Sequence, residues 1–363
     1  SVEAVCSRGR ALFERLLAPA LREVGEKCER LLVVPTPSLA ALPFEALVAG
    51  TKGAGAPRAF ADLEFVLDRY EVSYAPSAPV LVELASLGPA RRDGKVLVLA
   101  DPRYPSEGSE APISPQGVPA EAAGLRGVAR ASPEPVAFRR LEKTREEALA
   151  LAEMLASGGP KDLAALNDLR DQALTAESFD LYLGAEASPR RLSGDLRRYS
   201  ILHVAAHGYV DLEFPQRTGI ALSFPEGGDG YFTIADALEL DLDANLVVLS
   251  ACETGRGKPQ AGEGVESLAR AFMYAGARGV VASLWQVADE EAAGTMAAFY
   301  RGVIKEGRDP GRALREAKLT VRGRGGSREL RGVGLTSVQS KPTDVEAGHP
   351  FFWAPFIHLG LPR

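Results

Sequence analysis

The stretch ILHVAAHG, residues 201–208, is an apolar run that ends in a histidine and a glycine. Two more apolar runs follow it along the chain, Leu246–Ala251 and Gly279–Leu284. Uninterrupted apolar runs of this length are typical of strands that are covered on both faces. The segments between the runs are long enough to hold crossover helices, and such connections join parallel neighbours. The sequence therefore predicts an α/β fold with parallel strands.

The alternation of strands and helices continues on both sides of these runs. Further strands are expected at Leu31–Val34, Leu63–Leu67, Tyr70–Tyr74, Lys95–Ala100 and His349–Leu361. Helices are expected at 9–24, after a capping box formed by Thr144 and Glu147, at 263–278, and in segments that begin at Asp289 and Asp309. Residues 102–138 and 322–348 are polar, and their apolar residues follow neither the two-residue period of a strand nor the 3.6-residue period of a helix. They are therefore predicted to form two long loops.

Composition and charge exclude several functional classes. The 363 residues include 42 Lys and Arg against 48 Asp and Glu, and this net charge of −6 gives no basic field for nucleic acid or anionic lipid. No apolar run reaches the length of a membrane span. The three cysteines form no CxxC pair and no zinc-like cluster, which favours a reducing, cytoplasmic location. Because the chain begins with Ser1 and a helix-like stretch, we expect a fragment of a larger protein or a processed product.

Two reactive side chains end neighbouring apolar runs. His207 follows the first run and Cys252 follows the second. If these strands are parallel neighbours, both side chains emerge at the carboxyl edge of the sheet, where open α/β folds place their sites. A thiol needs a base beside it to act as a nucleophile, and its leaving group needs a proton donor. One imidazole can supply both functions, so the pair is a candidate cysteine protease dyad.

A structural role for Cys252 is the alternative, because free cysteine often packs as a small hydrophobe at the end of a strand. Three features favour catalysis. Polar residues follow directly at 253–255, a Gly-rich loop follows at 255–264, and His207 precedes Cys252 by an interval similar to that in caspases. A zinc site at His203 and His207 is disfavoured, because no third ligand clusters nearby in the sequence.

Five blocks of the sequence resemble the CHAT domain, the bacterial branch of the caspase and separase peptidases. They read LLVVPTPSLAALPFEAL at 31–47, ILHVAAHG at 201–208, LVVLSACETG at 246–255, GEGVESLARAFMYAGARGVVASLWQVADEEA at 262–292 and HPFFWAPFIHLG at 349–360. The blocks occur in the family's order and extend over nearly the whole chain. Five blocks in one order argue against chance similarity.

The resemblance implies a caspase-like three-layer α/β fold, with a mainly parallel central sheet flanked by helices. It divides the chain into an N-terminal, pseudo-caspase-like α/β half at 1–140, with loop 102–138, and a catalytic half at 141–363, with loop 322–348. It also implies peptide-bond cleavage without metal or cofactor. In that reaction His207 is the general acid and base and Cys252 is the nucleophile. The backbone N–H groups of Gly208 and Cys252 are the implied oxyanion hole.

The expected substrate pocket departs from the pattern of the separases. In those enzymes an acidic residue directly after the corresponding tryptophan lines the pocket for a P1 arginine, whereas here Trp285 is followed by Gln286. We therefore expect a neutral or small apolar P1 residue. Asp211 and Glu253 are further candidates for substrate binding, although exposed or capping roles also explain such acids.

These features predict a cysteine endopeptidase that cleaves a specific protein partner. The resemblance implies a role in bacterial defence, including antiviral defence, or in regulated death. It also implies that activity is gated by a partner, by a fused sensor or repeat module, or by movement of the two loops. The alternative is a catalytically silent, caspase-like pseudoprotease that acts as a scaffold for protein–protein interaction. Direct contact with nucleic acid or a membrane is not expected.

Overall fold

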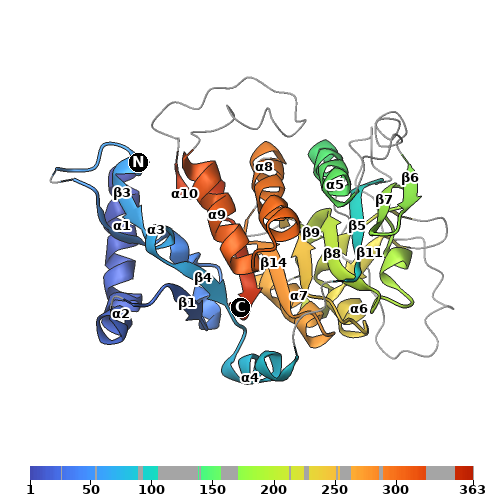
Figure 1. Cartoon of the computed structure of the whole chain (residues 1–363), viewed down its shortest axis with the longest axis horizontal. Helices are drawn as coiled ribbons and strands as arrows, with labels where there is room; N and C mark the ends of the chain where they lie inside the picture. Colours follow the sequence, from blue (N-terminus) through green and yellow to red (C-terminus); the bar gives the residue numbers. More distant parts are fainter. Residues whose placement is uncertain are drawn as a thin grey trace. The chain divides into compact units, whose positions relative to one another are not determined.

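The computed structural model of the chain is shown in Figure 1. It describes residues 1–25, 27–53, 55–88, 93–104, 138, 140–156, 171–211, 214–224, 229–250, 252–253, 263–285, 289–323 and 348–362. Within these ranges, only the backbone is described for residues 252–253, 263–266 and 289–291. Most of the two predicted loops, 102–138 and 322–348, lies outside the described residues, because residues 105–137 and 324–347 are not among them.

Contacts within the chain define two compact units. Unit 1 contains Ser1–Ala90, Ala261–Glu266 and Arg278–Arg363, and unit 2 contains Arg91–Gln260 and Ser267–Ala277. Unit 1 is discontinuous because a strand near the C-terminus pairs with a strand from the first third of the chain. The predicted division into halves follows the order of the chain rather than these contacts, and it stays a prediction.

Unit 1 is built on strands in the order β1 (Arg30–Val33), β4 (Glu71–Tyr74), β15 (Phe356–Gly360) and β14 (Gly279–Ser283). Strand β4 pairs in parallel with both β1 and β15, and β14 pairs antiparallel with β15. Helix α9 (Pro310–Gly323) packs on β4 and β15. The predicted strands at Tyr70–Tyr74 and Gly279–Leu284 are therefore confirmed.

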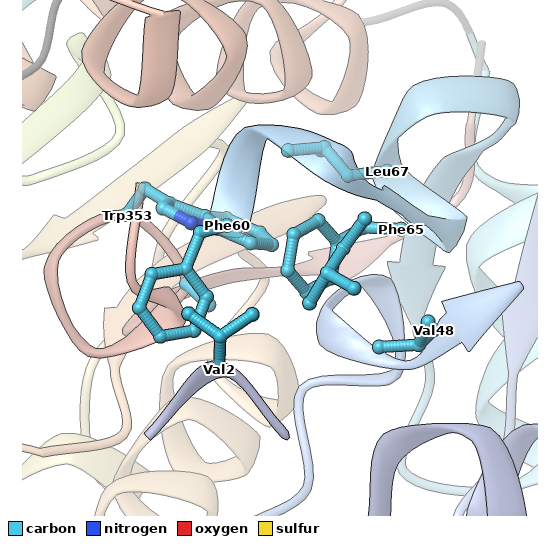
Figure 2. Close-up of a cluster of buried hydrophobic side chains, with 8 residues drawn as sticks. Val2, Val48, Phe60, Phe65, Leu67 and Trp353 are labelled. Atoms are coloured by element: carbon cyan, nitrogen blue, oxygen red, sulfur yellow. The ribbon is translucent and has the colours of Figure 1, made fainter. Parts of the chain in front are cut away.

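The core of unit 1 gathers large apolar side chains from both ends of the chain. Figure 2 shows the converging side chains of Val2, Val48, Phe60, Phe65, Leu67 and Trp353. Phe65 and Trp353 meet edge to face with their ring centroids 5.1 Å apart, a geometry that aromatic pairs favour. The indole N–H of Trp353 donates to the carbonyl of Gly348 at 2.9 Å. The ring is therefore buried without an unsatisfied donor.

A buried ion pair connects α9 to the first third of the chain within unit 1. Lys318 on α9 contacts one carboxylate oxygen of Glu45, and the hydroxyl of Tyr74 donates to the other. None of these three residues is more than 2% exposed. Burial lowers the pKa of Lys318, and Glu45 opposes this shift. Each charge is therefore enclosed together with its partner, which is the condition under which buried charges are tolerated.

A buried histidine on β15, His358, faces strand β4 of the same unit. Its Nδ1 lies 3.0 Å from the hydroxyl of Ser73. Burial lowers the pKa of His358 to about 4, while Asp309 opposes the shift and Lys318 adds to it. The imidazole is therefore neutral near neutral pH, and its role is structural.

His358 is expected to make unit 1 less stable in acid. Its pKa in the folded protein lies below the ordinary value of 6.5, so the unfolded chain binds the proton first and stability is lost as the pH falls from 6.5 towards 4. The expected loss is about 2 kcal/mol between pH 6.5 and pH 5. Unfolding can be followed by the fluorescence of Trp285 and Trp353, since both lie in unit 1. The variant His358→Gln should lose less unfolding free energy over this range, and equal losses in the two proteins would contradict the prediction.

Unit 2 contains strands in the order β12 (Leu246–Leu249), β8 (Tyr199–Ala205), β5 (Lys95–Pro102), β7 (Phe179–Gly184) and β6 (Gln172–Thr175). The first four are parallel, and β6 is antiparallel to β7. Every residue of β7 and β8 is buried. In Figure 1, helices α5 (Glu142–Leu155) and α6 (Ile234–Leu238) lie on opposite sides of these strands. The predicted α/β fold with a mainly parallel sheet flanked by helices is confirmed.

A second, smaller sheet of unit 2 continues from the ends of two of these strands. Its order is β11 (Tyr231–Thr233), β10 (Gly219–Ala221), β9 (His207–Tyr209) and β13 (Cys252–Glu253). Strand β9 follows β8 along the chain, and β13 follows β12. Strands β9 and β13 are parallel, whereas β10 is antiparallel to both β9 and β11.

The described part of the chain also has further α-helices and a separate two-stranded sheet formed by β2 (Val48–Thr51) and β3 (Leu63–Phe65). The helices are α1 (Val2–Leu16), α2 (Ala18–Val24), α3 (Val66–Arg69), α4 (Ala78–Ser86), α7 (Glu263–Tyr274), α8 (Asp289–Tyr300) and α10 (Pro350–Trp353). None of the helices in this part of the chain has the length and apolar character needed to cross a membrane.

The predicted strand at His349–Leu361 is wrong in its first part, where α10 precedes β15. Pro350 suits the first position of a helix, because its missing N–H and fixed φ cost nothing there. The Nδ1 of His349 then caps this helix by accepting from the N–H of Phe351 at 3.0 Å. The cap formed by His349 therefore makes the first part of this aromatic-rich segment helical, and the strand begins only at Phe356.

The predicted strand at Leu63–Leu67 ends early, at Phe65, where α3 begins. The cause is again a cap, since the carboxylate of Asp68 accepts from the N–H of Phe65 at 2.8 Å. A carboxylate in this position satisfies a donor that the first turn of a helix leaves unpaired.

Candidate active site

The two residues predicted to form a dyad lie on adjacent strands of unit 2. Strands β9 and β13 pair in parallel, and in this register Cys252 lies beside His207 while Glu253 lies beside Gly208. The backbone therefore brings the two predicted residues together at the ends of two buried, parallel strands. The side chain of Cys252 lies outside the described residues.

The imidazole of His207 packs against aromatic rings. Phe138 stacks on it with the ring centroids 5.3 Å apart and an interplanar angle of 28°. The ring of Tyr104 lies against it at 5.5 Å and 49°. Tyr104 and Phe138 are 1% and 2% exposed, and His207 is 6% exposed. The imidazole is therefore held by side chains that are themselves fixed in a packed cluster.

The hydroxyl of Tyr104 joins two strands beside His207. It accepts from the backbone N–H of His207 at 3.4 Å and donates to the carbonyl of Ala221 at 3.0 Å. Ala221 on β10 lies opposite His207 in the antiparallel register. Burial raises the pKa of Tyr104 well above its usual value, so the phenol keeps the proton that it donates. The position of the β9 backbone at His207 thus depends on this side chain.

Asp101 at the end of β5 fixes the backbone near Tyr104. Its carboxylate is fully buried and accepts two hydrogen bonds from the guanidinium of Arg140, at 2.8 and 2.7 Å. A further contact comes from Arg145 at 3.4 Å. Asp101 has a φ of 48°, a left-handed conformation that Asp tolerates better than most residues. Since bidentate arginine–carboxylate pairs restrict geometry strongly, this pair ties the end of β5 to the start of α5.

The capping box predicted at Thr144 and Glu147 is wrong, because α5 already begins at Glu142. The hydroxyl of Thr144 instead accepts from the N–H of Asp101 at 3.0 Å and donates to the carbonyl of Leu141 at 2.7 Å. Thr144 therefore makes a tertiary contact instead of the predicted cap, and so does Glu147.

Glu147 belongs to a buried polar cluster behind the dyad. Its Oε1 lies 3.3 Å from Nε2 of His203 on β8, and its Oε2 accepts from the hydroxyl of Ser250 at 3.2 Å. Burial lowers the pKa of His203 to about 3, so this ring is neutral near neutral pH. The cluster connects α5 to the strand segments that lead into His207 and Cys252. Within the described ranges, no group of three or more His, Cys, Asp or Glu side chains could hold a metal ion.

A comparison with protein families identifies the chain. The family model described as the CHAT domain matches residues 7–361. The chain belongs to the CHAT domain family. The five sequence blocks that resemble CHAT domains all lie within the matched residues, so the resemblance expected from the sequence is confirmed.

Three known proteins are similar to this CHAT domain. Tetratricopeptide repeat protein 28 from Homo sapiens is 39% identical over 128 residues, which are 35% of this chain and 4% of that protein. A chain of the Saccharomyces cerevisiae separase–securin complex has a TM-score of 0.47 and 14% identity, and the match covers 91% of this chain and 16% of that chain. The Arg-specific cysteine proteinase gingipain R has a TM-score of 0.43 and 9% identity, with 100% of this chain and 68% of that chain covered. The sequence match thus spans only a small part of the curated relative.

The predicted substrate-binding residues of this CHAT domain have different surroundings. The carboxylate of Asp211, in unit 2, accepts from the N–H of Phe214 at 2.8 Å and so stabilises a local turn. Trp285, in unit 1, stacks on Phe351 at 6.3 Å and donates to its carbonyl at 3.0 Å. Gln286 and the side chain of Glu253 lie outside the described residues. Their roles in substrate binding stay predictions.

Three residues of this CHAT domain that lie near His207 or on the strand segments leading into it and Cys252 are not indicated by the sequence pattern. Tyr104 and Phe138 lie at the two borders of a segment that the sequence predicts as a loop, and the pattern around Glu147 predicts a helix cap. An isolated aromatic residue beside a polar, Pro-rich segment is a weak signal, although it does suggest that the chain returns to the core at that point. Nothing in the spacing indicates that Tyr104 and Phe138 contact His207, or that Glu147 lies beside His203 and Ser250, because these contacts join residues far apart in the sequence.

Proposed function

We propose that this CHAT domain is a cysteine endopeptidase in which Cys252 is the nucleophile and His207 is the general acid and base. The parallel register that sets Cys252 beside His207 carries this proposal. Membership of the CHAT family supports it, because the family resemblance implies a peptidase with a histidine and a cysteine at these two positions. The burial of the β8 and β12 strands supports it further, since rigid strands hold reacting groups in constant geometry.

In the proposed reaction, the thiol of Cys252 gives its proton to His207 and the sulfur attacks the carbonyl carbon of the peptide bond. The carbonyl oxygen takes up the negative charge, which the N–H groups of Gly208 and Cys252 stabilise. The C–N bond then breaks, the imidazolium gives its proton to the leaving amine, and a thioester remains. Water, deprotonated by His207, hydrolyses the thioester and restores the thiol.

The proposed substrate is a specific protein with a neutral or small apolar residue at P1. The support is the identity of residue 286, because a glutamine follows Trp285 where the separase pattern has an acid. A glutamine lacks the negative charge that pairs with a P1 arginine. Trp285, Gln286, Asp211 and Glu253 remain the candidates that contact this substrate.

The proposed setting is a bacterial defence or regulated-death system in a reducing, cytoplasmic compartment. The similarity to a tetratricopeptide repeat protein supports gating by a repeat or sensor module, fused or separate. Such a module acts on the equilibrium between active and inactive arrangements through its different affinity for the two.

Covalent labelling tests the proposed nucleophile without a known substrate. Peptide acyloxymethyl ketones with alanine, leucine or arginine at P1 are incubated with the protein under reducing, metal-free conditions, and mass spectrometry locates the adducts. We expect labelling of Cys252 in preference to Cys6 and Cys28, which are the internal controls, because a paired imidazole favours the reactive thiolate. We also expect faster labelling by the alanine and leucine peptides than by the arginine peptide.

Two results would change the interpretation. Labelling of all three cysteines at similar rates, with no cleavage of a peptide library, would favour the silent pseudoprotease scaffold. Preferential labelling of Cys252 by the arginine peptide would retain the peptidase and reverse the predicted P1 preference.

A further inference from the structure

We propose that Tyr104 and Phe138 are positioning residues that hold the imidazole of His207 in the orientation needed for proton exchange with Cys252. The inference rests on the proposed function and adds two residues to its machinery. Neither belongs to the sequence blocks that resemble CHAT domains. Their contact with His207 comes from the tertiary structure alone.

The geometry supports orientation rather than packing alone. The ring of Phe138 is nearly parallel to the imidazole, at 28° and 5.3 Å, so it covers one face of His207 and limits rotation about the side-chain bonds. Tyr104 contacts the same imidazole at 49° and also accepts from the backbone N–H of His207. One residue therefore restrains the ring, and the other restrains both the ring and the backbone that carries it. A proton acceptor held in one orientation reacts faster than one that samples several.

An aromatic face also favours the charged form of histidine. During cleavage His207 becomes an imidazolium, and a cation over the face of an aromatic ring within about 6 Å of its centroid is stabilised by the ring quadrupole. The centroid separations of 5.3 and 5.5 Å lie within this range. Phe138 thus offers stabilisation that a branched aliphatic side chain of similar bulk lacks.

The two aromatic residues are held in place by an ion pair outside the dyad. Asp101 lies three residues before Tyr104, Arg140 lies two residues after Phe138, and the two charged groups form the bidentate pair described above. The pair therefore joins the two backbone segments from which the aromatic rings project. Because the carboxylate of Asp101 is fully buried, breaking its ion pair with Arg140 costs more free energy than breaking an exposed ion pair.

The test compares single variants of the whole chain. Phe138→Leu removes the aromatic face, Phe138→Tyr restores it, and Tyr104→Phe removes only the hydroxyl. Phe224→Leu is the matched control, because it makes the same change in the same cluster at a ring that packs edge to face against Tyr231. Two quantities are measured for each protein: the rate of Cys252 alkylation by iodoacetamide at pH 7, and the pKa of His207 from an NMR titration of histidine-labelled protein.

We expect Phe138→Leu to lower the alkylation rate about 5-fold and the pKa of His207 by about half a unit. Phe138→Tyr should match the unmodified protein in both measurements. Tyr104→Phe should lower the rate about 5-fold without a change in the pKa of His207, because the ring remains while the two hydrogen bonds of the hydroxyl, from the His207 N–H and to the Ala221 carbonyl, are lost. Phe224→Leu should change neither quantity.

Several outcomes overturn the inference. It is wrong if Phe138→Leu behaves like the unmodified protein, or if Phe224→Leu shows the same losses, which would reveal a general packing effect. It is also wrong if Phe138→Tyr fails to restore both values. If Cys252 of the unmodified protein reacts no faster than Cys6 and Cys28, the proposed function fails instead. In that case the NMR titration still shows whether Phe138 stabilises the charged form of His207.

Discussion

Cys252→Ala is expected to lower kcat/KM for peptide cleavage by about 10⁴-fold or more, because no other group can form the thioester. His207→Ala is expected to cause a loss of similar size, since the thiol then has no base and the leaving amine has no acid. Residues that act as one unit are strongly non-additive. The kcat/KM of the double variant should therefore lie within about a factor of 10 of the lower of the two values measured for the single variants.

Cleavage profiling with a diverse peptide library, under reducing conditions and without metal, measures these losses and reveals the preferred P1 residue. Cys28→Ala is the control, because Cys28 lies in unit 1 and its thiol donates to the carbonyl of Arg30. Its activity should equal that of the unmodified chain. Cleavage that persists in Cys252→Ala, or losses in the two single variants that multiply in the double variant, would show that the two residues do not form a catalytic unit.

Lys318→Met is expected to lower the free energy of unfolding of unit 1 by about 3–5 kcal/mol. The substitution leaves the carboxylate of Glu45 buried without its cation, and the hydroxyl of Tyr74 alone is a poor replacement for a full charge. Denaturation by urea, followed by the fluorescence of Trp285 and Trp353, measures this unit because both tryptophans belong to it.

Two variants separate the buried charge from other effects. Arg312→Met on the same helix breaks an exposed ion pair with Glu316 and should cost less than about 0.5 kcal/mol. The double variant Lys318→Met/Glu45→Met removes both charges and should be more stable than Lys318→Met alone, because no unpaired charge then remains in the core. A double variant that is less stable than the single one would falsify this account of the ion pair.

The strand pattern and the neighbouring positions of His207 and Cys252 could be predicted because both depend on short-range signals. An uninterrupted apolar run indicates a buried strand whatever its neighbours are, and the run Ile201–Ala206 indeed lies almost entirely in β8. A polar residue directly after such a run marks the edge of a parallel sheet, which is how His207 and Cys252 were found together. The parts of the predicted loops 102–138 and 322–348 that fall at 105–137 and 324–347, and the residue Gln286, lie outside the described residues, so they stay predictions.

The errors at Thr144, Leu63–Leu67 and His349–Leu361 share one physical cause. In each segment a side-chain hydrogen bond that the apolar pattern does not show accompanies the observed structure, locally at Asp68 and His349 and over a long sequence distance at Thr144. The hydroxyl of Thr144 binds the N–H of Asp101, a residue 43 positions away, instead of starting its own helix. Such a partner cannot be found by examining neighbouring residues.

The sequence by itself determined the α/β class, favoured parallel strands, and singled out His207 and Cys252 as the candidate dyad, because apolar periodicity and residue chemistry are properties of short segments. The tertiary structure alone decided which side chains surround His207. Tyr104, Phe138 and Ala221 reach it from three different parts of the chain, and only the packing of unit 2 brings them within contact. It also decided that Lys318 pairs with Glu45, since a buried charge needs a partner in space rather than in sequence.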